Sequence, residues 1–168
     1  MKNISLVLAF LTLSGTSAGP QTVKKHEPDF KLTISATKQD YSKGDQIVVN
    51  AKETNISSHK LQVSRIPDSA QWYKMRVLYK GIPVPTTATY DQTINPPASP
   101  GGWIAGNAWS LPPLAPGKSR GFDIPLSDYF VMNRPGTYEV SFTRGTDPGQ
   151  ADSVDVESNT IQITLADN

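Results

Sequence analysis

Apolar and polar residues alternate with a period of two in short stretches along most of this 168-residue chain. This period places every second side chain on one face, so each stretch is predicted to be a half-buried β-strand. Gly, Pro, Asn and Asp separate the stretches, as expected of turns. The chain is therefore predicted to be an all-β, antiparallel sandwich of about seven to nine strands. The alternating stretches are residues 30–36, 47–54, 60–66, 71–81, 136–144 and 159–166.

The sequence also predicts an edge segment and a helical turn. Pro83 and Pro85 confine residues 82–85 to a sheet edge, because proline cannot donate to a ladder of hydrogen bonds. The segment 127–131, SDYFV, is predicted to form one helical turn.

The N-terminus has the layout of a secretory signal peptide. Lys2 gives a positive start, Ile4 to Leu13 form an apolar run, and small residues lead to a cleavage site after Ala18. The apolar run is shorter than the roughly 20 residues that span a bilayer, so we expect no membrane span. These features predict a secreted or periplasmic protein. The expected organisation is a cleaved signal peptide at 1–18, a flexible leader at 19–29 and an Ig-like sandwich at 30–168.

The absence of Cys and the balance of charges exclude several classes of function. The chain has no Cys, which excludes disulfides, Cys–zinc sites and thiol nucleophiles. Its 16 basic and 15 acidic residues nearly balance and form no basic stripe along the sequence. Nucleic acid is therefore not an expected partner, since it requires clustered Lys and Arg.

An uncharged stretch, NPPASPGGWIAGNAWSLPP at 95–113, interrupts the strand pattern. Its Pro and Gly exclude a helix or a central strand, so we predict a long loop over residues 86–113. Long loops are often functional or disordered, and aromatic content without charge disfavours disorder. The rings either cap an open end of the sandwich or form an aromatic binding surface, and the sequence leaves both open. The candidate binding residues are Tyr90, Trp103, Ile104 and Trp109.

Clustered polar residues suggest weaker candidates for metal binding. His26, Glu27 and Asp29 resemble a metal-ligand set, but a solvated leader is the favoured interpretation. Asp152, Asp155 and Glu157 lie in or near one loop without the spacing of an EF-hand, which favours a solvated acidic loop over a calcium site. We therefore predict no metal site and no cofactor.

Two other polar positions also have a simple interpretation. His59 lies in a polar turn and is expected at the surface. The tripeptide Asn55–Ser57 fits an N-glycosylation acceptor, which matters only in a eukaryotic secretory pathway. No nucleophile elbow or catalytic triad signature is present, so we predict no catalytic residue and no enzyme activity.

The second half of the chain resembles the C-terminal half of bacterial secreted Ig-like or fibronectin-III-like domains. The segments that carry this resemblance are LAPGKS, FDIPLSDYF, RPGTYEVSFTR and SNTIQITL, and residues 41–61 are compatible with the first half. The resemblance implies an architecture and no particular function. Tyr138 opens a strand after a Gly turn, where a tyrosine corner places its hydroxyl on backbone upstream, here within Ser127–Pro135.

Two narrower families share single features with this chain. The turn Leu114–Ser119 is similar to one in small bacterial intracellular proteinase inhibitors, although the signal peptide disfavours an intracellular role. The stretch Gly136–Val140 is similar to a strand of periplasmic copper-binding sandwiches, but this chain has few His and Met residues for such a site.

Taken together, these features predict an exported, non-catalytic binding or accessory module. Its partner is expected to be a protein or glycan in the envelope or outside the cell, contacted by residues 86–113. The alternative is a proteinase inhibitor that presents a rigid Pro-rich loop, which loses little entropy on binding. A third possibility is an enzyme whose site has no signature in the sequence.

Overall fold

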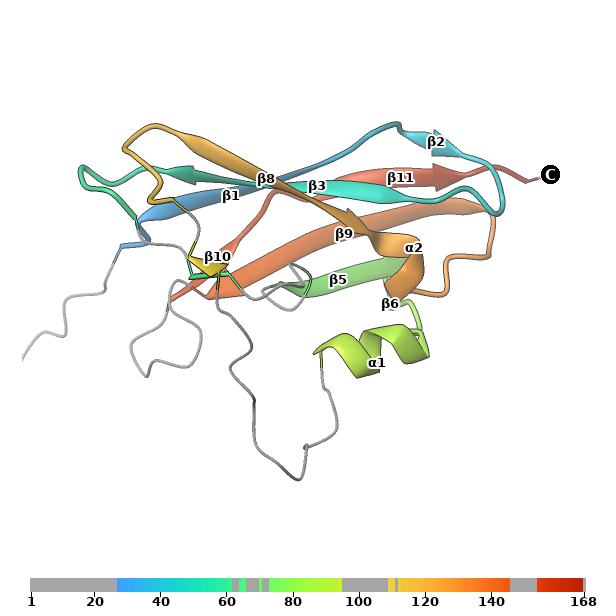
Figure 1. Ribbon diagram of the computed structural model, residues 1–168. Helices are drawn as coiled ribbons and strands as arrows, with labels where there is room; N and C mark the ends of the chain where they lie inside the picture. The colour runs from blue at the N-terminus through green and yellow to red at the C-terminus, as the bar shows by residue number, and fades with distance from the viewer. Residues whose placement is uncertain are drawn as a thin grey trace, which may run out of the picture.

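Two layers of β-strands form the body of the molecule in the computed structural model (Figure 1). The structure describes residues 27–61, 64–65, 70, 73–94, 109–110, 112–145 and 154–167, so the predicted signal peptide lies outside it. The first sheet contains, in order, β1 (Phe30–Ala36), β3 (Val48–Asn55) and β8 (Ser119–Pro125). The second contains β2 (Asp40–Tyr41), β11 (Ile161–Leu165), β9 (Gly136–Gly145), β5 (Lys74–Tyr79) and β6 (Ile82–Pro83), with β10 (Asp155–Glu157) paired to β9.

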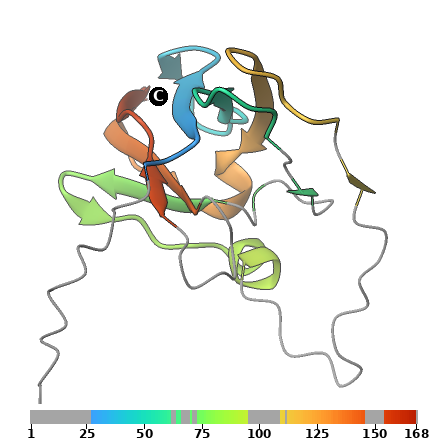
Figure 2. The same ribbon diagram turned by 90° about the vertical axis from the view of Figure 1, so that its left-hand side faces the viewer.

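Smaller elements lie outside these two sheets. A short antiparallel pair joins β4 (Ser64–Arg65) to β7 (Trp109–Ser110). The helices are α1 (Ala88–Ile94) and α2 (Leu126–Tyr129). Viewed from one end, α1 lies outside the layers, below the β5–β6 hairpin (Figure 2).

The strand order is that of an Ig-like sandwich. β1, β3 and β8 take the places of strands A, B and E, while β5, β9 and β10–β11 take those of C, F and G. The chain leaves the first sheet after β1 and joins the second through β2, which runs parallel to β11. The prediction of an Ig-like β-sandwich is confirmed.

Alternation along the strands builds the core between the sheets. Tyr138, Val140 and Phe142 on β9 point inward and are at most 1% exposed. They face the first sheet, where Val49 and Ala51 of β3 are fully buried. Burying each large apolar side chain contributes about 1.5–3 kcal/mol, so this inner face supplies much of the folding energy.

The connection between β10 and β11 forms a β-bulge that helps to join the two sheets. Residues 157–161 face only residues 140–143 of β9, so the segment that joins β10 to β11 has one extra residue. Within the bulge, Asn159 Oδ1 accepts from the Ile34 amide at 2.8 Å and Nδ2 donates to the Ile34 carbonyl at 3.0 Å. The side chain thereby satisfies backbone groups at the open edge of β1, which would otherwise be able to pair with another chain.

The structure agrees with both short predictions. Residues 82–83 form β6 at the end of the second sheet, so the predicted edge position is confirmed. The predicted helical turn at 127–131 is present as α2, which begins one residue earlier.

Three segments differ from the sequence prediction. Residues 40–41, which lie between the predicted strands 30–36 and 47–54, form β2, because the buried ring of Tyr41 anchors them beside β11. The segment 86–113 was predicted to be a loop throughout, but it begins with α1 and includes β7. The Thr87 hydroxyl accepts from the Tyr90 amide at 3.3 Å and caps the first turn of α1. Of the predicted strand 60–66, the described part contains β4 and a bridge from Leu61.

The β5–β6 hairpin turns through Lys80 and Gly81, with φ values of 52° and 77°. Positive φ at both central residues is the geometry of a type I′ turn, in which Asn is favoured over Lys. We expect Lys80→Asn to raise the free energy of unfolding by about 0.5–1 kcal/mol in urea denaturation, because a left-handed conformation strains most L-residues. Lys43→Asn is the matched control, since Lys43 also precedes a positive-φ glycine but is not itself left-handed. An equal gain in both variants would contradict the strain argument.

Candidate functional site

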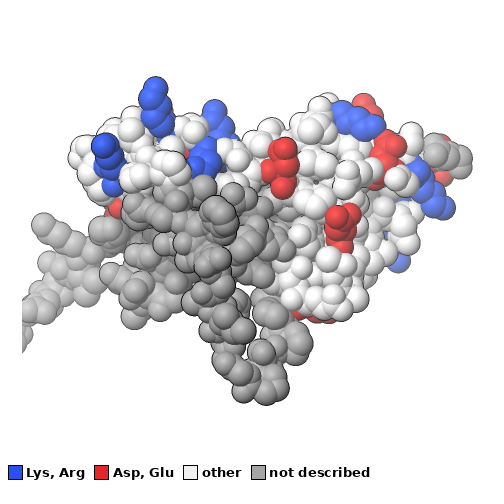
Figure 3. Space-filling model, in the orientation of Figure 1, with Lys and Arg blue, Asp and Glu red and all other residues white. Residues whose placement is uncertain are grey.

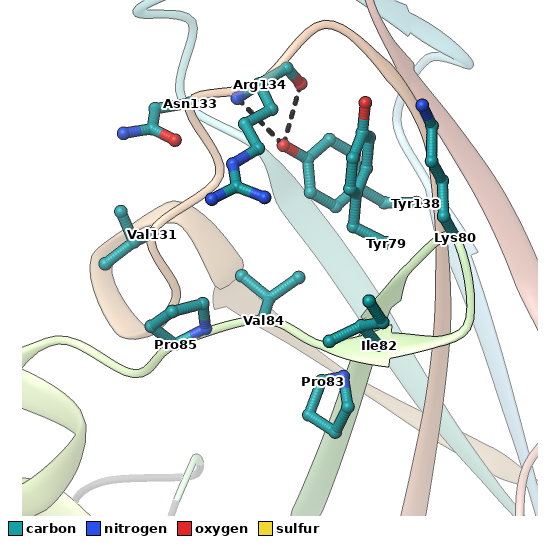
Figure 4. Close-up of a pocket in the computed structure, with 10 residues that line it drawn as sticks. All are labelled: Tyr79, Lys80, Ile82, Pro83, Val84, Pro85, Val131, Asn133, Arg134 and Tyr138. Atoms are coloured by element: carbon teal, nitrogen blue, oxygen red, sulfur yellow. Dashed lines mark hydrogen bonds between the residues drawn. The ribbon is translucent and has the colours of Figure 1, made fainter.

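A groove of about 370 Å³ opens between the β5–β6 hairpin and the connector from α2 to β9 (Figure 4). Its two walls are joined by a 2.9 Å hydrogen bond from the Val131 amide to the Pro85 carbonyl. Ile82 is 69% exposed and Val131 is 40% exposed, so large apolar side chains on both walls remain open to solvent. The lining residues are Tyr79, Lys80, Ile82, Pro83, Val84, Pro85, Val131, Asn133, Arg134 and Tyr138.

Two tyrosines fix the connector wall of the groove. The Tyr138 hydroxyl donates to the Arg134 carbonyl at 2.7 Å and accepts from the Arg134 amide at 3.0 Å. The Tyr79 hydroxyl donates to the Pro135 carbonyl at 2.8 Å, and the two rings lie 5.0 Å apart. The Tyr138 contact has the geometry of a tyrosine corner within Ser127–Pro135.

Gly136 makes this arrangement possible. Its φ is 125°, and a Cβ built there would lie 3.1 Å from the Tyr79 ring. Glycine is therefore required both by the backbone conformation and by the close approach of the ring.

Removing the two hydroxyls is expected to have unequal effects. Tyr138→Phe should lower the free energy of unfolding by about 1–3 kcal/mol, because it leaves the Arg134 amide and carbonyl without this partner beside a buried ring. Tyr79→Phe should cost about 0.5–1 kcal/mol, since its hydroxyl is solvent-accessible. Chemical denaturation of both variants measures the difference. A smaller loss for Tyr138→Phe than for Tyr79→Phe would contradict this reading.

The groove is lined by two cations and no carboxylate. Arg134 is exposed, and its guanidinium lies over the groove between Val131 and Val84 (Figure 4). The Lys80 amine lies 5.4 Å from the centre of the Tyr79 ring at the other side. Neither cation forms a salt bridge with a carboxylate among the described residues.

A buried ion pair lies between the sheets. Glu53 on β3 is 1% exposed and forms a salt bridge with Arg144 on β9, which is 6% exposed. The Tyr73 hydroxyl donates to Glu53 Oε1 at 2.7 Å, and the Phe30 ring lies 5.3 Å from the guanidinium carbon. Burial lowers the pKa of Arg144 to about 10, so the guanidinium stays charged at neutral pH. Burial raises the pKa of Tyr73, so its hydroxyl stays a donor.

This ion pair was not found from the sequence, although the strand pattern contained a signal. Glu53 continues the inward series of Val49 and Ala51 on β3, and Arg144 continues that of Phe142 on β9. When a charged residue occupies an inward-facing position of the alternating pattern, either the strand ends there or the charge pairs with another group inside the protein. The Glu53 carboxylate binds both the Arg144 guanidinium and the Tyr73 hydroxyl inside the core, as expected of a cluster that stabilises the fold.

The predicted aromatic binding residues have different outcomes. Tyr90 is half-buried on α1, and its ring lies 5.4 Å from that of Phe130, so one face packs against the core. Trp103 and Ile104 lie outside the described residues. The Trp109 backbone pairs with Arg65, while its side chain is not among those described. The proposed aromatic surface therefore remains a prediction.

The N-terminal candidate set is only partly described. His26 lies outside the described residues and Glu27 is exposed. Asp29 Oδ2 lies 3.8 Å from His59 Nε2, and both side chains are partly exposed. In the described part of the chain, no group of three or more His, Cys, Asp or Glu residues could hold a metal ion.

The acidic loop is only partly described. Asp155 forms an exposed salt bridge with Lys74 at 3.1 Å, and Glu157 is exposed on β10. Asp152 lies outside the described residues. On the face shown in Figure 3, described basic side chains gather at the left end, acidic side chains lie in the middle, and both kinds lie together at the right, so no continuous basic stripe crosses this face. None of the described helices is long and apolar enough to cross a bilayer.

Comparison with solved structures finds distant likenesses. The crystal structure of a CARDB domain from Pyrococcus furiosus, in complex with di-metal ions, is 12% identical, with 83% of this chain and 94% of that chain covered at a TM-score of 0.42. The solution structure of that domain gives 10% identity, with coverage of 83% and 95%, and a TM-score of 0.38. A β-glucosidase from Listeria innocua in complex with glucose gives 12% identity and a TM-score of 0.38, with 83% of this chain but only 16% of that chain covered.

At these identities and TM-scores, the likenesses assign neither a ligand nor an activity to this chain. No protein-family model matches the sequence, and no curated protein matches it. The class of protein is thus defined by its own topology, an Ig-like β-sandwich with an apolar groove at one sheet edge.

Proposed function

We propose that the protein is an exported, non-catalytic binding or accessory module, whose contact surface is the groove together with the adjoining segment 86–113. The observation that carries this proposal is the exposure of Ile82 and Val131 over a hollow with fixed walls. Apolar side chains that gather at a concave surface are typical of binding sites. A wall fixed before binding loses little entropy when a partner docks.

The position of α1 supports including the segment 86–113. The Thr87 hydroxyl donates to the Asp128 carbonyl at 2.6 Å, and the Thr87 amide donates to the Tyr129 carbonyl at 2.9 Å. These bonds attach the start of α1 to α2, which leads directly into the connector wall of the groove. We therefore propose that Trp103, Ile104 and Trp109 also contribute to partner binding.

The buried ion pair supports a non-catalytic role. Glu53 is the buried carboxylate of the described core, and its salt bridge to Arg144 and hydrogen bond to Tyr73 give it a structural function. A general acid or base must instead reach a substrate from a cleft.

Affinity capture from the host's envelope and secreted fraction tests this function. The bait is residues 19–168, compared with a Trp103→Ala/Trp109→Ala variant and with Trp72→Ala as a tryptophan control outside the segment. We expect a partner that the parent and Trp72→Ala retain and the folded double variant loses. Retention of nothing above the bare matrix, or equal retention by all three, would contradict the proposal.

A protease inhibition assay separates the alternative role. A binding module leaves the activity of host proteases unchanged, whereas an inhibitor abolishes one of them at stoichiometric amounts. Stoichiometric inhibition that is lost in the double variant would replace the accessory role with an inhibitory one.

A further inference from the structure

We propose that the groove binds an extended segment of a partner protein in which an apolar side chain lies next to a carboxylate. This inference rests on the proposed binding function and adds the chemistry of the partner. It follows from the size, the charge and the backbone of the groove.

The size and lining of the groove suit a short apolar anchor. Its volume of about 370 Å³ is near the lower end of the roughly 300–1,000 Å³ found for ligand sites. Val84 is buried at its floor, and Ile82 and Val131 stand exposed on opposite walls. An aliphatic side chain placed between these walls would cover both exposed groups. Each apolar Å² removed from water contributes about 25 cal/mol.

The positive charge of the groove favours a partner that carries an anion beside its apolar side chain. Arg134 and Lys80 are its charged lining residues, so the local field is positive. A guanidinium pairs with a carboxylate through two parallel hydrogen bonds. The Tyr138 hydroxyl holds both the amide and the carbonyl of Arg134, so the arginine side chain extends from a fixed point of the backbone.

Three features of the groove disfavour an added β-strand, a sugar and a nucleic acid as its ligand. Pro83 lies on the edge strand β6 and has no N–H, so an added strand would lack a donor there. The Tyr79 and Tyr138 rings pack on each other, and Tyr138 is 1% exposed, so the half-buried Tyr79 is the one lining ring on which a sugar could stack. Two cations are also too few for a nucleic acid backbone. A side-chain anchor with a neighbouring carboxylate is the chemistry that remains.

Fluorescence anisotropy with two short labelled peptides tests the inference. One contains Leu–Glu pairs spaced by Gly and Ser, and the other contains Leu–Lys pairs on the same spacer. We expect the full-chain protein to bind the Leu–Glu peptide at least about tenfold more tightly. The affinity should fall by about tenfold or more in Arg134→Gln and in Ile82→Ser, and it should weaken with added salt.

Matched controls keep the result specific to the groove. Arg76 is exposed on β5 outside the groove, and Ile56 is an exposed aliphatic residue elsewhere, at 57%. Arg76→Gln and Ile56→Ser should bind the Leu–Glu peptide like the parent. Absence of binding, equal binding of both peptides, or equal losses in the control variants would overturn the inference.

If capture from the envelope succeeds while the Leu–Glu peptide does not bind, the inferred chemistry of the partner is wrong and the proposed binding function stands. If both fail, the binding function falls too.

Discussion

Replacing Glu53 with Ala is expected to lower the free energy of unfolding by about 3–5 kcal/mol, the largest effect of any single change considered. The variant leaves the Arg144 guanidinium, only 6% exposed, without the carboxylate that compensates its removal from water. It also removes the acceptor of the Tyr73 hydroxyl. Urea denaturation of the parent and the variant measures the loss.

Two comparisons test whether the loss comes from the buried pair. Glu139→Ala removes an exposed carboxylate from β9 and should change stability by less than about 0.5 kcal/mol. The double variant Glu53→Leu/Arg144→Met should recover most of the stability, because apolar replacements of a buried pair are often neutral or stabilising. A double variant as unstable as Glu53→Ala would show that the loss does not come from an uncompensated charge.

Replacing Asn55 with Ala should cost about 2–4 kcal/mol, because its side chain organises the end of β3. Nδ2 donates to the His59 and Leu114 carbonyls at 2.7 and 2.8 Å, and Oδ1 accepts from the amide and hydroxyl of Ser57. Asn55 is fully buried, so its removal leaves backbone groups with neither this partner nor easy access to water. Thermal and urea unfolding of Asn55→Ala measure the cost.

Asn50→Ala is the matched control for this prediction. Asn50 lies on the same strand, but its amide donates to Asp123 at an exposed position, so its loss should cost less than about 1 kcal/mol. Equal losses in the two variants would contradict the role given to Asn55. The same contacts disfavour glycosylation of the folded protein at Asn55. Its side-chain Nδ2 is buried and donates to the His59 and Leu114 carbonyls.

The strands were predictable because their signal is local. Phe30, Leu32 and Ile34 alternate within seven residues, and this pattern fixes both the strand and its buried face. The parallel pairing of β2 with β11 was missed, since it joins residues 40–41 to residues 164–165. A two-residue strand has no period of its own, so only the folded chain reveals it.

The groove was beyond sequence reasoning for a similar reason. The prolines of residues 82–85 correctly indicated an edge, but the groove forms only where this segment meets residues 131–135. The contact from Tyr79 to Pro135 spans 56 positions and has no pattern in the sequence. Likewise, Glu53 and Arg144 meet only because two sheets face each other.

Photo-crosslinking in living host cells tests most directly whether the groove is the contact surface. A benzoylphenylalanine replaces Ile82 at the groove in one variant and Ile56, the exposed control, in another. The account predicts an ultraviolet-dependent adduct with a partner protein from position 82, which is absent at position 56 and is lost when Arg134→Gln is added. Adducts of equal yield from both positions, or an adduct from position 56 alone, would contradict it.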